Sequence, residues 1–163
     1  RTLDAMALEL DCALPDELRH EFGGIAATHR AFPDSLEALN MLRKRGLVLG
    51  ALRNVDEASF ETILNDLDFS FDIEVTAQRV GAYKPDKAHF LAALADLRAQ
   101  GIESEHVLHV AQSKRADIVP ATELGLACVW VERPGHVFGR KGCGAESVRA
   151  TYRVSSLAEL LDF

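Results

Sequence analysis

Cysteine is scarce in this chain of 163 residues, and basic residues do not outnumber acidic ones. The three cysteines, Cys12, Cys128 and Cys143, are odd in number and widely separated. They also lack the short Cys and His spacings of a metal site. This pattern argues against a disulfide-stabilised secreted domain, so we expect free thiols and a reducing, cytoplasmic environment.

The chain also lacks a long apolar run and a basic character. No stretch approaches the roughly 20 apolar residues that span a bilayer, so we expect no membrane partner. The 18 Lys and Arg against 25 Asp and Glu give a net charge of −7, and nucleic-acid binding needs clustered basic side chains, so we expect no such partner either. With 48% hydrophobic and 26% charged residues, the composition is typical of a globular domain. The oligomeric state is left open.

From about residue 34 onward, helical and strand patterns alternate along the chain. Short, mostly apolar runs predict strands at 47–52, 71–77, 107–111, 127–131 and 152–154. The run at 47–52 is apolar throughout, which is typical of a strand buried on both faces. Alternation of strands and helices predicts a three-layer α/β/α, Rossmann-like fold around a parallel sheet. Residues 1–32 are predicted to be helical instead.

Two aspartates precede predicted helices at positions typical of an N-cap. Asp34 is followed three residues later by Glu37, the arrangement of a capping box. Asp56 follows the strand predicted at 47–52 and precedes another helical segment. We therefore predict that both carboxylates cap the helices that follow them.

Candidate functional residues follow the predicted strands. Ligands of an open parallel sheet bind beyond the carboxyl ends of its strands. Arg53 and Asn54 follow the first predicted strand, Lys84 lies in the loop after the second, and Ser113 and Asp117 lie in the loop after the third. We therefore expect these side chains to meet at one edge of the sheet.

The same loops carry a resemblance to a known family. The segments LGALRNVD, VGAYKPDKAHF and LHVAQSKRADIVPATELGLACVWVERPG resemble the second, third and fourth motifs of the haloacid dehalogenase superfamily. The Gln-Ser pair of the last segment is most similar to the 2-haloacid dehalogenase-like branch. The resemblance covers roughly residues 32–133. It implies that residues 1–32 are the end of a helical cap and residues 33–163 the α/β core.

The resemblance also implies a reaction. In that family an aspartate at the end of the first strand attacks the substrate, and water then releases the product. The implied activity is hydrolysis by nucleophilic displacement on a small acidic substrate, with Lys84 as the motif-three lysine that stabilises negative charge. Asp117 matches a motif-four aspartate, and Asn54, Arg53 and Ser113 are the candidate substrate-binding residues. The family's phosphatases hold Mg²⁺ while its dehalogenases do not, so we expect no cofactor unless the chain is a phosphatase.

Some positions depart from the family pattern. Arg53 stands where the family has serine or threonine, and Gln112 stands where its phosphatases have aspartate. No apolar strand ending in aspartate precedes residue 34. In the family fold that strand lies between those predicted at 47–52 and 107–111. We therefore expect an incomplete chain that lacks the nucleophile and is inactive alone.

Each candidate residue also has a simpler interpretation. Lys84 could be a solvated loop lysine, Asp117 a helix N-cap and Asn54 a turn residue. Arg53 could contact substrate, fill the pocket or lie on the surface. His109, in the middle of a strand, is predicted to be a hydrogen-bonded core or edge histidine rather than a ligand.

Two other functions are compatible with these residues. Arg53 and Gln112 lie at motif positions where catalysis is selective, which favours a non-catalytic binding module built on the same fold. Among enzymes, a Mg²⁺-dependent phosphatase is the alternative to a dehalogenase. The two enzyme classes differ in whether a chelator abolishes activity.

Overall fold

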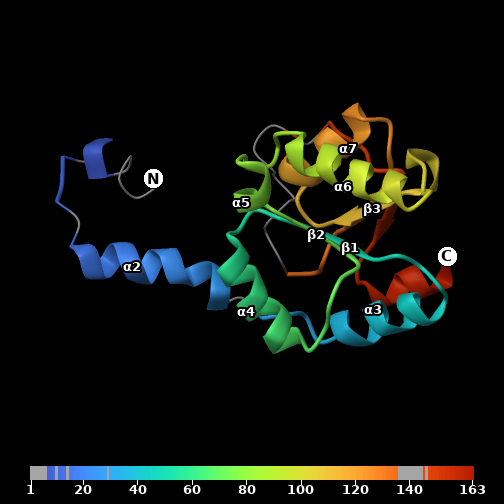
Figure 1. The fold of residues 1–163 in the computed structure, drawn as a ribbon, viewed down its shortest axis with the longest axis horizontal. Helices are drawn as coiled ribbons and strands as arrows, with labels where there is room; N and C mark the ends of the chain where they lie inside the picture. The colour runs from blue at the N-terminus through green and yellow to red at the C-terminus, as the bar shows by residue number, and fades with distance from the viewer. Residues whose placement is uncertain (1–6, 10, 14, 29, 136–144, 146) are drawn as a thin grey trace.

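The computed structural model describes residues 7–9, 11–13, 15–28, 30–135, 145 and 147–163, and Figure 1 shows its helices and strands. The helices are α2 (Asp16–Gly24), α3 (Ser35–Lys44), α4 (Glu57–Leu67), α5 (Ala77–Val80), α6 (Ala88–Ala99) and α7 (Val119–Glu123). The strands are β1 (Gly50–Arg53), β2 (Ile73–Thr76), β3 (Leu108–Ala111), β4 (Ala127–Val131) and β5 (Tyr152–Val154). Shorter turns are η1 (Ile25–Thr28), η2 (Ser104–His106), η4 (Ala158–Asp162) and the π-helical η3 (Lys114–Ile118). The predicted mixed α/β fold is confirmed.

The strands form two parallel sheets rather than one. β1 pairs with β2, with Gly50 opposite Ile73, and the second sheet has the order β3-β4-β5. Among the described strands, β1 and β3 therefore each have a hydrogen-bonded neighbour on one side only. The division falls between the two strands that the family resemblance places on either side of a further strand.

The start of β1 differs from its prediction. The strand begins at Gly50, and Leu47 and Val48 are 51% and 40% exposed, so burial of the whole 47–52 run on both faces is wrong. A strand with one open edge leaves apolar side chains near its start without neighbours to pack against. Leu108, at the start of β3, is likewise 42% exposed.

Helices cover both faces of the strands. In Figure 1, α5, α6 and α7 lie on one side of the strands, and α3 and α4 lie on the other. The main core cluster contains Phe90, Ile118, Cys128 and Trp130. A second cluster forms around Val129 and the neighbouring strand β5. These clusters fix the strands whose carboxyl ends carry the candidate residues.

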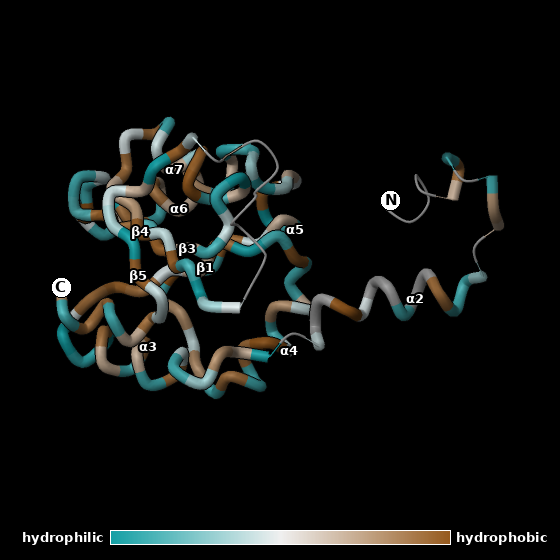
Figure 2. Tube along the Cα trace, turned by 180° about the vertical axis from the view of Figure 1, so that it is seen from behind, coloured by the Kyte–Doolittle hydropathy of each residue, from teal (hydrophilic) through white to brown (hydrophobic). Residues whose placement is uncertain are grey.

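The N-terminal helical segment extends away from this body. Figures 1 and 2 show α2 projecting from the α/β region, and η1 contacts α4. Residues 1–6, 10, 14 and 29 of the predicted helical region lie outside the described residues. The proposed boundary between residues 32 and 33 stays a prediction. No helix in the described part of the chain has the length and hydropathy needed to cross a bilayer.

The two predicted helix caps have different outcomes. Asp56 caps α4 as predicted, since its carboxylate accepts the Ser59 N–H at 2.8 Å. Asp34 makes no cap hydrogen bond, so the predicted capping box is wrong. Its Oδ2 instead accepts hydrogen bonds from Arg133 Nη2 at 3.1 Å and from the Leu157 N–H at 2.7 Å. A hydrogen bond between two charged groups is stronger than a neutral one, so the long-range partners prevail.

We expect Asp34→Ala to lower the free energy of unfolding by about 2 kcal/mol, because Arg133 would lose the partner of its largely covered guanidinium. The Arg133 side chain is only 11% exposed. Asp66→Ala is the matched control, since Asp66 pairs with an Arg30 side chain that is 72% exposed. That change should cost less than about 1 kcal/mol. Equal losses in urea denaturation would contradict a structural role for the Asp34–Arg133 pair.

Candidate functional site

Lys84 is held in a buried ion pair. Its Nζ donates to the backbone oxygen of Leu52 at 2.7 Å and to Asp117 Oδ1 at 2.6 Å. The Lys84 and Asp117 side chains are only 9% and 10% exposed, so the interpretation of Lys84 as a solvated loop lysine is wrong. An ammonium has three N–H donors. Two of them are used within the described part of the chain, which leaves one for an incoming acceptor.

The Lys84 ammonium lies at the unpaired edge of β1. The carbonyl oxygens of Leu49 and Val55 accept from Ile73 and Ala77, so both face β2. Successive residues of a strand direct their backbone groups to alternate sides. Leu52 is an odd number of residues from both, so its carbonyl faces the opposite edge. The ammonium bound to that carbonyl therefore lies on the side where β1 has no described strand beside it.

Asp117 reaches this position from the π-helical turn η3 after β3. The predicted cap role belongs to Ser113 instead, because Ser113 Oγ accepts the Ala116 N–H at 3.1 Å. The Asp117 N–H donates to the Ser113 backbone oxygen at 3.1 Å, so the interpretation of Asp117 as an N-cap is wrong. π-helical turns are rare and often lie at functional sites. The turn brings a buried carboxylate to Lys84.

His109 is a site residue that the sequence analysis missed. Its Nε2 lies 3.4 Å from Asp117 Oδ1, without the alignment of a hydrogen bond, and its ring packs on Phe90 with centroids 4.8 Å apart. Burial alone would raise the pKa of Asp117, but His109 and Lys84 outweigh it and hold this pKa below its usual value. Asp117 is therefore an ionised carboxylate at neutral pH. In the sequence, the signal for this role was a single histidine within an otherwise apolar strand.

Asn54 and His89 hold the backbone around the ion pair. Asn54 Oδ1 accepts the Lys84 N–H at 2.8 Å, and Asn54 Nδ2 donates to the Lys84 oxygen at 3.0 Å. His89 is fully buried, and its Nε2 lies 3.1 Å from the Arg53 backbone oxygen. Burial lowers the pKa of His89, so the neutral imidazole donates this hydrogen bond. These contacts join the two loops that follow β1 and β2.

Arg53 and Gln112 lie at the carboxyl ends of β1 and β3. Arg53 is the last residue of β1 and is half-buried. Burial lowers the pKa of its guanidinium, and the negative charge of Asp117 partly offsets this effect. Gln112 accepts the indole N–H of Trp130 at 3.0 Å through its backbone oxygen. The predicted residues Arg53, Asn54, Lys84 and Asp117 are thus linked through one set of loops, while the Ser113 hydroxyl is used in its own turn.

The described residues do not by themselves fit a magnesium ion. Across the described ranges, no group of at least three His, Cys, Asp or Glu side chains is close enough to hold a metal. The carboxylate at this site, Asp117, already pairs with Lys84. Mg²⁺ requires near-octahedral oxygen ligands, and one or two carboxylates usually supply part of them. A metal here would need ligands from outside this set.

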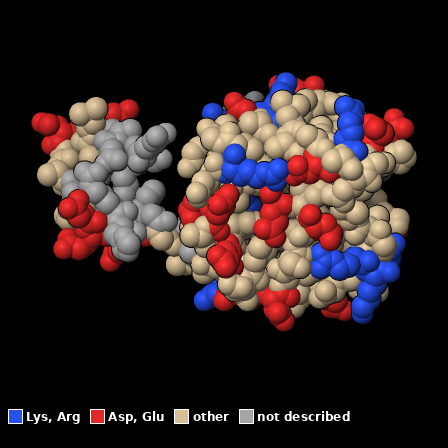
Figure 3. Space-filling view, viewed as in Figure 1, with Lys and Arg blue, Asp and Glu red and all other residues tan. Residues whose placement is uncertain are grey.

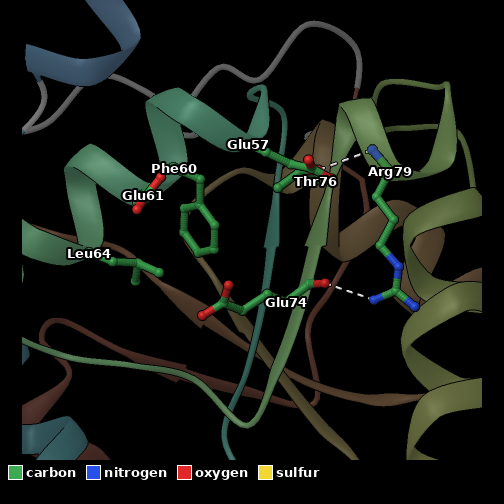
Figure 4. A pocket seen from close by; sticks show the side chains of 7 residues that line it. All are labelled: Glu57, Phe60, Glu61, Leu64, Glu74, Thr76 and Arg79. Carbon is green, nitrogen blue, oxygen red and sulfur yellow. Dashed lines mark hydrogen bonds between the residues drawn. The ribbon is translucent and has the colours of Figure 1, made fainter.

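A separate surface pocket lies between α4 and β2. Figure 4 shows its lining side chains, which are Glu57, Phe60, Glu61, Leu64, Glu74, Thr76 and Arg79. Arg79 is already engaged, since it donates to the Glu74 backbone oxygen at 2.8 Å and pairs with Asp96. Figure 3 shows acidic side chains gathered on the face that α4 presents. None of the predicted site residues lines this pocket, so the candidate site is the Lys84–Asp117 pair.

Sequence comparison adds a family and its members. A family model described as haloacid dehalogenase-like hydrolase matches residues 3–125 of this chain. The (S)-2-haloacid dehalogenase of Pseudomonas putida is 26% identical over 153 residues, which make up 93% of this chain and 63% of that protein. The chain therefore spans less than two thirds of the length of this relative.

Solved structures of both a dehalogenase and a phosphatase are similar to this chain. The L-2-haloacid dehalogenase RSc1362 superposes with a TM-score of 0.75 at 25% identity, covering 99% of this chain and 68% of its own. The HAD phosphatase from Thermococcus onnurineus gives a TM-score of 0.67 at 25% identity, covering 98% of this chain and 68% of its own. Similarity alone therefore does not separate the two chemistries.

Proposed function

Because the chain belongs to the haloacid dehalogenase-like hydrolase family, we propose that it acts in nucleophilic displacement on a small acidic substrate of the 2-haloacid type. The observation that carries this proposal is the buried Lys84–Asp117 pair, whose ammonium lies at the unpaired edge of β1. The names of the Pseudomonas putida relative and of RSc1362 support the same substrate class. In this proposal Lys84 stabilises negative charge, and Asp117 holds the lysine side chain in place.

The nucleophile in this proposal is an aspartate at the end of a further strand between β1 and β3. A strand there would pair with β1 on one side and with β3 on the other, and so would join the two sheets into one. It would also supply hydrogen-bond partners for the backbone groups at both open edges. Its carboxyl end would lie at the same sheet edge as the candidate loops. The remaining N–H of Lys84 is available to hold such a carboxylate. Without this strand the chain is proposed to be inactive.

The chemistry then proceeds in two displacement steps. A carboxylate oxygen of the aspartate attacks C2 of the substrate, and the carbon–halogen bond breaks to release halide. Water then hydrolyses the resulting ester, giving a 2-hydroxy acid and restoring the aspartate. Throughout both steps Lys84 balances the charge of the carboxylate nucleophile and of the oxyanion formed during hydrolysis.

A phosphatase is the second candidate, favoured by the similarity to the Thermococcus onnurineus HAD phosphatase. This reaction would need Mg²⁺, with a carboxylate of the inserted strand joining Asp117 as a ligand. Gln112, at the position of a phosphatase aspartate, offers a neutral amide in place of a charged ligand. The dehalogenase proposal needs no such ligand set.

The proposal can be tested by adding the strand as a synthetic peptide. One peptide carries an apolar β-strand sequence ending in aspartate, and its control ends in asparagine. Both should raise the Tm of the chain, because a ligand that binds the native state stabilises it. Only the aspartate peptide should support halide release from 2-chloropropionate, and EDTA should leave that release unchanged.

The other outcomes separate the alternatives. Phosphate release from p-nitrophenyl phosphate that EDTA abolishes would indicate the phosphatase. A rise in Tm with both peptides but no turnover of either substrate would favour a non-catalytic binding module. If neither peptide changes the Tm, the proposal of a strand between β1 and β3 is wrong.

A further inference from the structure

Arg53 differs from the other partly buried arginines of the described chain. Arg43 donates to the Ser70 backbone oxygen at 2.6 Å, and Arg133 pairs with Asp34 at 3.0 Å. Arg53 is half-buried like them, yet within the described ranges its guanidinium has no hydrogen bond or ion pair. Partial removal of an unpaired charge from water destabilises a fold. A half-buried cation kept without a partner is therefore expected to have a partner outside the chain.

The fold holds Arg53 at the candidate site. It directly follows Leu52, whose carbonyl oxygen binds Lys84 Nζ. His89, fully buried in α6, fixes the Arg53 backbone oxygen at 3.1 Å. Lys84 donates to Asp117 Oδ1 at 2.6 Å, so the carboxylate of the described site is already engaged. The backbone of Arg53 is fixed while its charge remains available.

We infer that Arg53 is the anchor for the substrate's carboxylate group, an inference that rests on the proposed function. The planar guanidinium matches a carboxylate with two parallel N–H···O bonds. In the proposed site, Lys84 and Arg53 carry two positive charges, and Asp117 and the nucleophilic aspartate carry two negative ones. A monoanionic carboxylate therefore adds one uncompensated negative charge, whereas a phosphate dianion adds two. This balance favours a monoanionic acid over a phosphate dianion. The arginine replaces the short hydroxyl side chain of the family pattern with a longer, charged donor.

The inference can be tested by binding, without turnover. Acetate, 2-chloropropionate and inorganic phosphate are titrated into the chain while the fluorescence of its one tryptophan is followed. This residue, Trp130, donates to the Gln112 oxygen in a loop of the site. Arg53→Met should weaken binding of both carboxylates at least 10-fold, and Arg53→Lys should weaken it less. Arg115→Met is the control, because Arg115 is exposed and has no ion pair with any other described residue, and it should leave binding unchanged.

The Tm of the unliganded variants separates an anchor from a structural residue. Arg53→Met should leave the Tm unchanged or raise it, because it removes a half-buried unpaired charge. A structural arginine would instead lower the Tm on removal. Retention of wild-type carboxylate binding in Arg53→Met would overturn the inference. So would failure of the wild-type chain to bind either carboxylate, or an Arg53-dependent affinity that is confined to phosphate.

The binding experiment and the peptide experiment can each refute one proposal without refuting the other. Carboxylate binding that depends on Arg53, together with no halide release after addition of the aspartate peptide, would keep the anchor and reject the hydrolase. Halide release with the same KM in wild type and Arg53→Met would keep the hydrolase and reject the anchor.

Discussion

Lys84→Ala should lower the free energy of unfolding by about 3 to 5 kcal/mol, because it leaves the buried carboxylate of Asp117 without its cation. The Asp117 side chain is only 10% exposed, so water replaces the lost ammonium poorly. The second lost contact is the hydrogen bond to the Leu52 carbonyl at the open edge of β1. The change should be measured by urea denaturation at pH 7, where a lower midpoint with an unchanged slope reports stability alone.

Lys87→Ala provides a matched control three residues further on. Lys87 pairs with Glu123 at 2.9 Å, but these side chains are 41% and 54% exposed. An exposed pair of this kind contributes less than about 1 kcal/mol. Equal losses for the two lysine variants would show that the Lys84–Asp117 pair carries no special stability.

A double variant tests the cause of the loss. Lys84→Met combined with Asp117→Asn removes both charges, so no unpaired ion remains in the interior. This variant should be more stable than Lys84→Met alone, since the cost of breaking a buried ion pair comes mainly from the charge left behind. A double variant that loses the sum of the two single changes would indicate that the residues act independently.

The meeting of Lys84 with Asp117 was predictable from the sequence, whereas the way they are held was not. Parallel strands bring the loops at their carboxyl ends to one edge, so locating the strands was enough to bring these loops together. The role of Asn54 as a clamp on the Lys84 backbone depends on two loops whose residues lie 30 positions apart. The approach of His109 to Asp117 depends on the π-helical geometry of η3, which no local sequence pattern predicts.

Local rules failed where a distant partner competed with them. Asp34 fits the capping pattern, yet its carboxylate binds Arg133, which lies 99 positions away. The apolar run at 47–52 predicts a strand, yet β1 begins only at Gly50, where pairing with Ile73 begins. In both cases short-range propensity was correct about the element and wrong about its contacts, because tertiary packing decides those contacts.

Asp117→Asn should remove a large part of the acid sensitivity of the fold. The pKa of Asp117 lies below its ordinary value of 3.8 in the folded chain, so folding favours the charged form. Its stabilisation is therefore complete above the ordinary pKa and is lost as the pH falls through the lower, folded-state pKa. At pH 7, Asp117→Asn should be less stable than wild type by about 3 kcal/mol, because Lys84 keeps a buried charge without a counterion.

The difference between the two curves isolates this carboxylate from the other titrating groups. Urea midpoints of wild type and Asp117→Asn should begin to converge as the pH falls below 3.8 and should converge further as it falls through the lower, folded-state pKa, because wild type then loses the charge that the variant already lacks. Asp56→Asn is the comparison, since Asp56 also has a lowered pKa through its hydrogen bonds to Ser59. Asp56 is exposed, and asparagine caps a helix as well as aspartate does, so this variant should differ little from wild type at any pH. A gap for Asp117→Asn that stays constant as the pH falls below 3.8 would mean that Asp117 is not ionised in the folded chain, and Lys84 would then need another anion to hold it at the edge of β1.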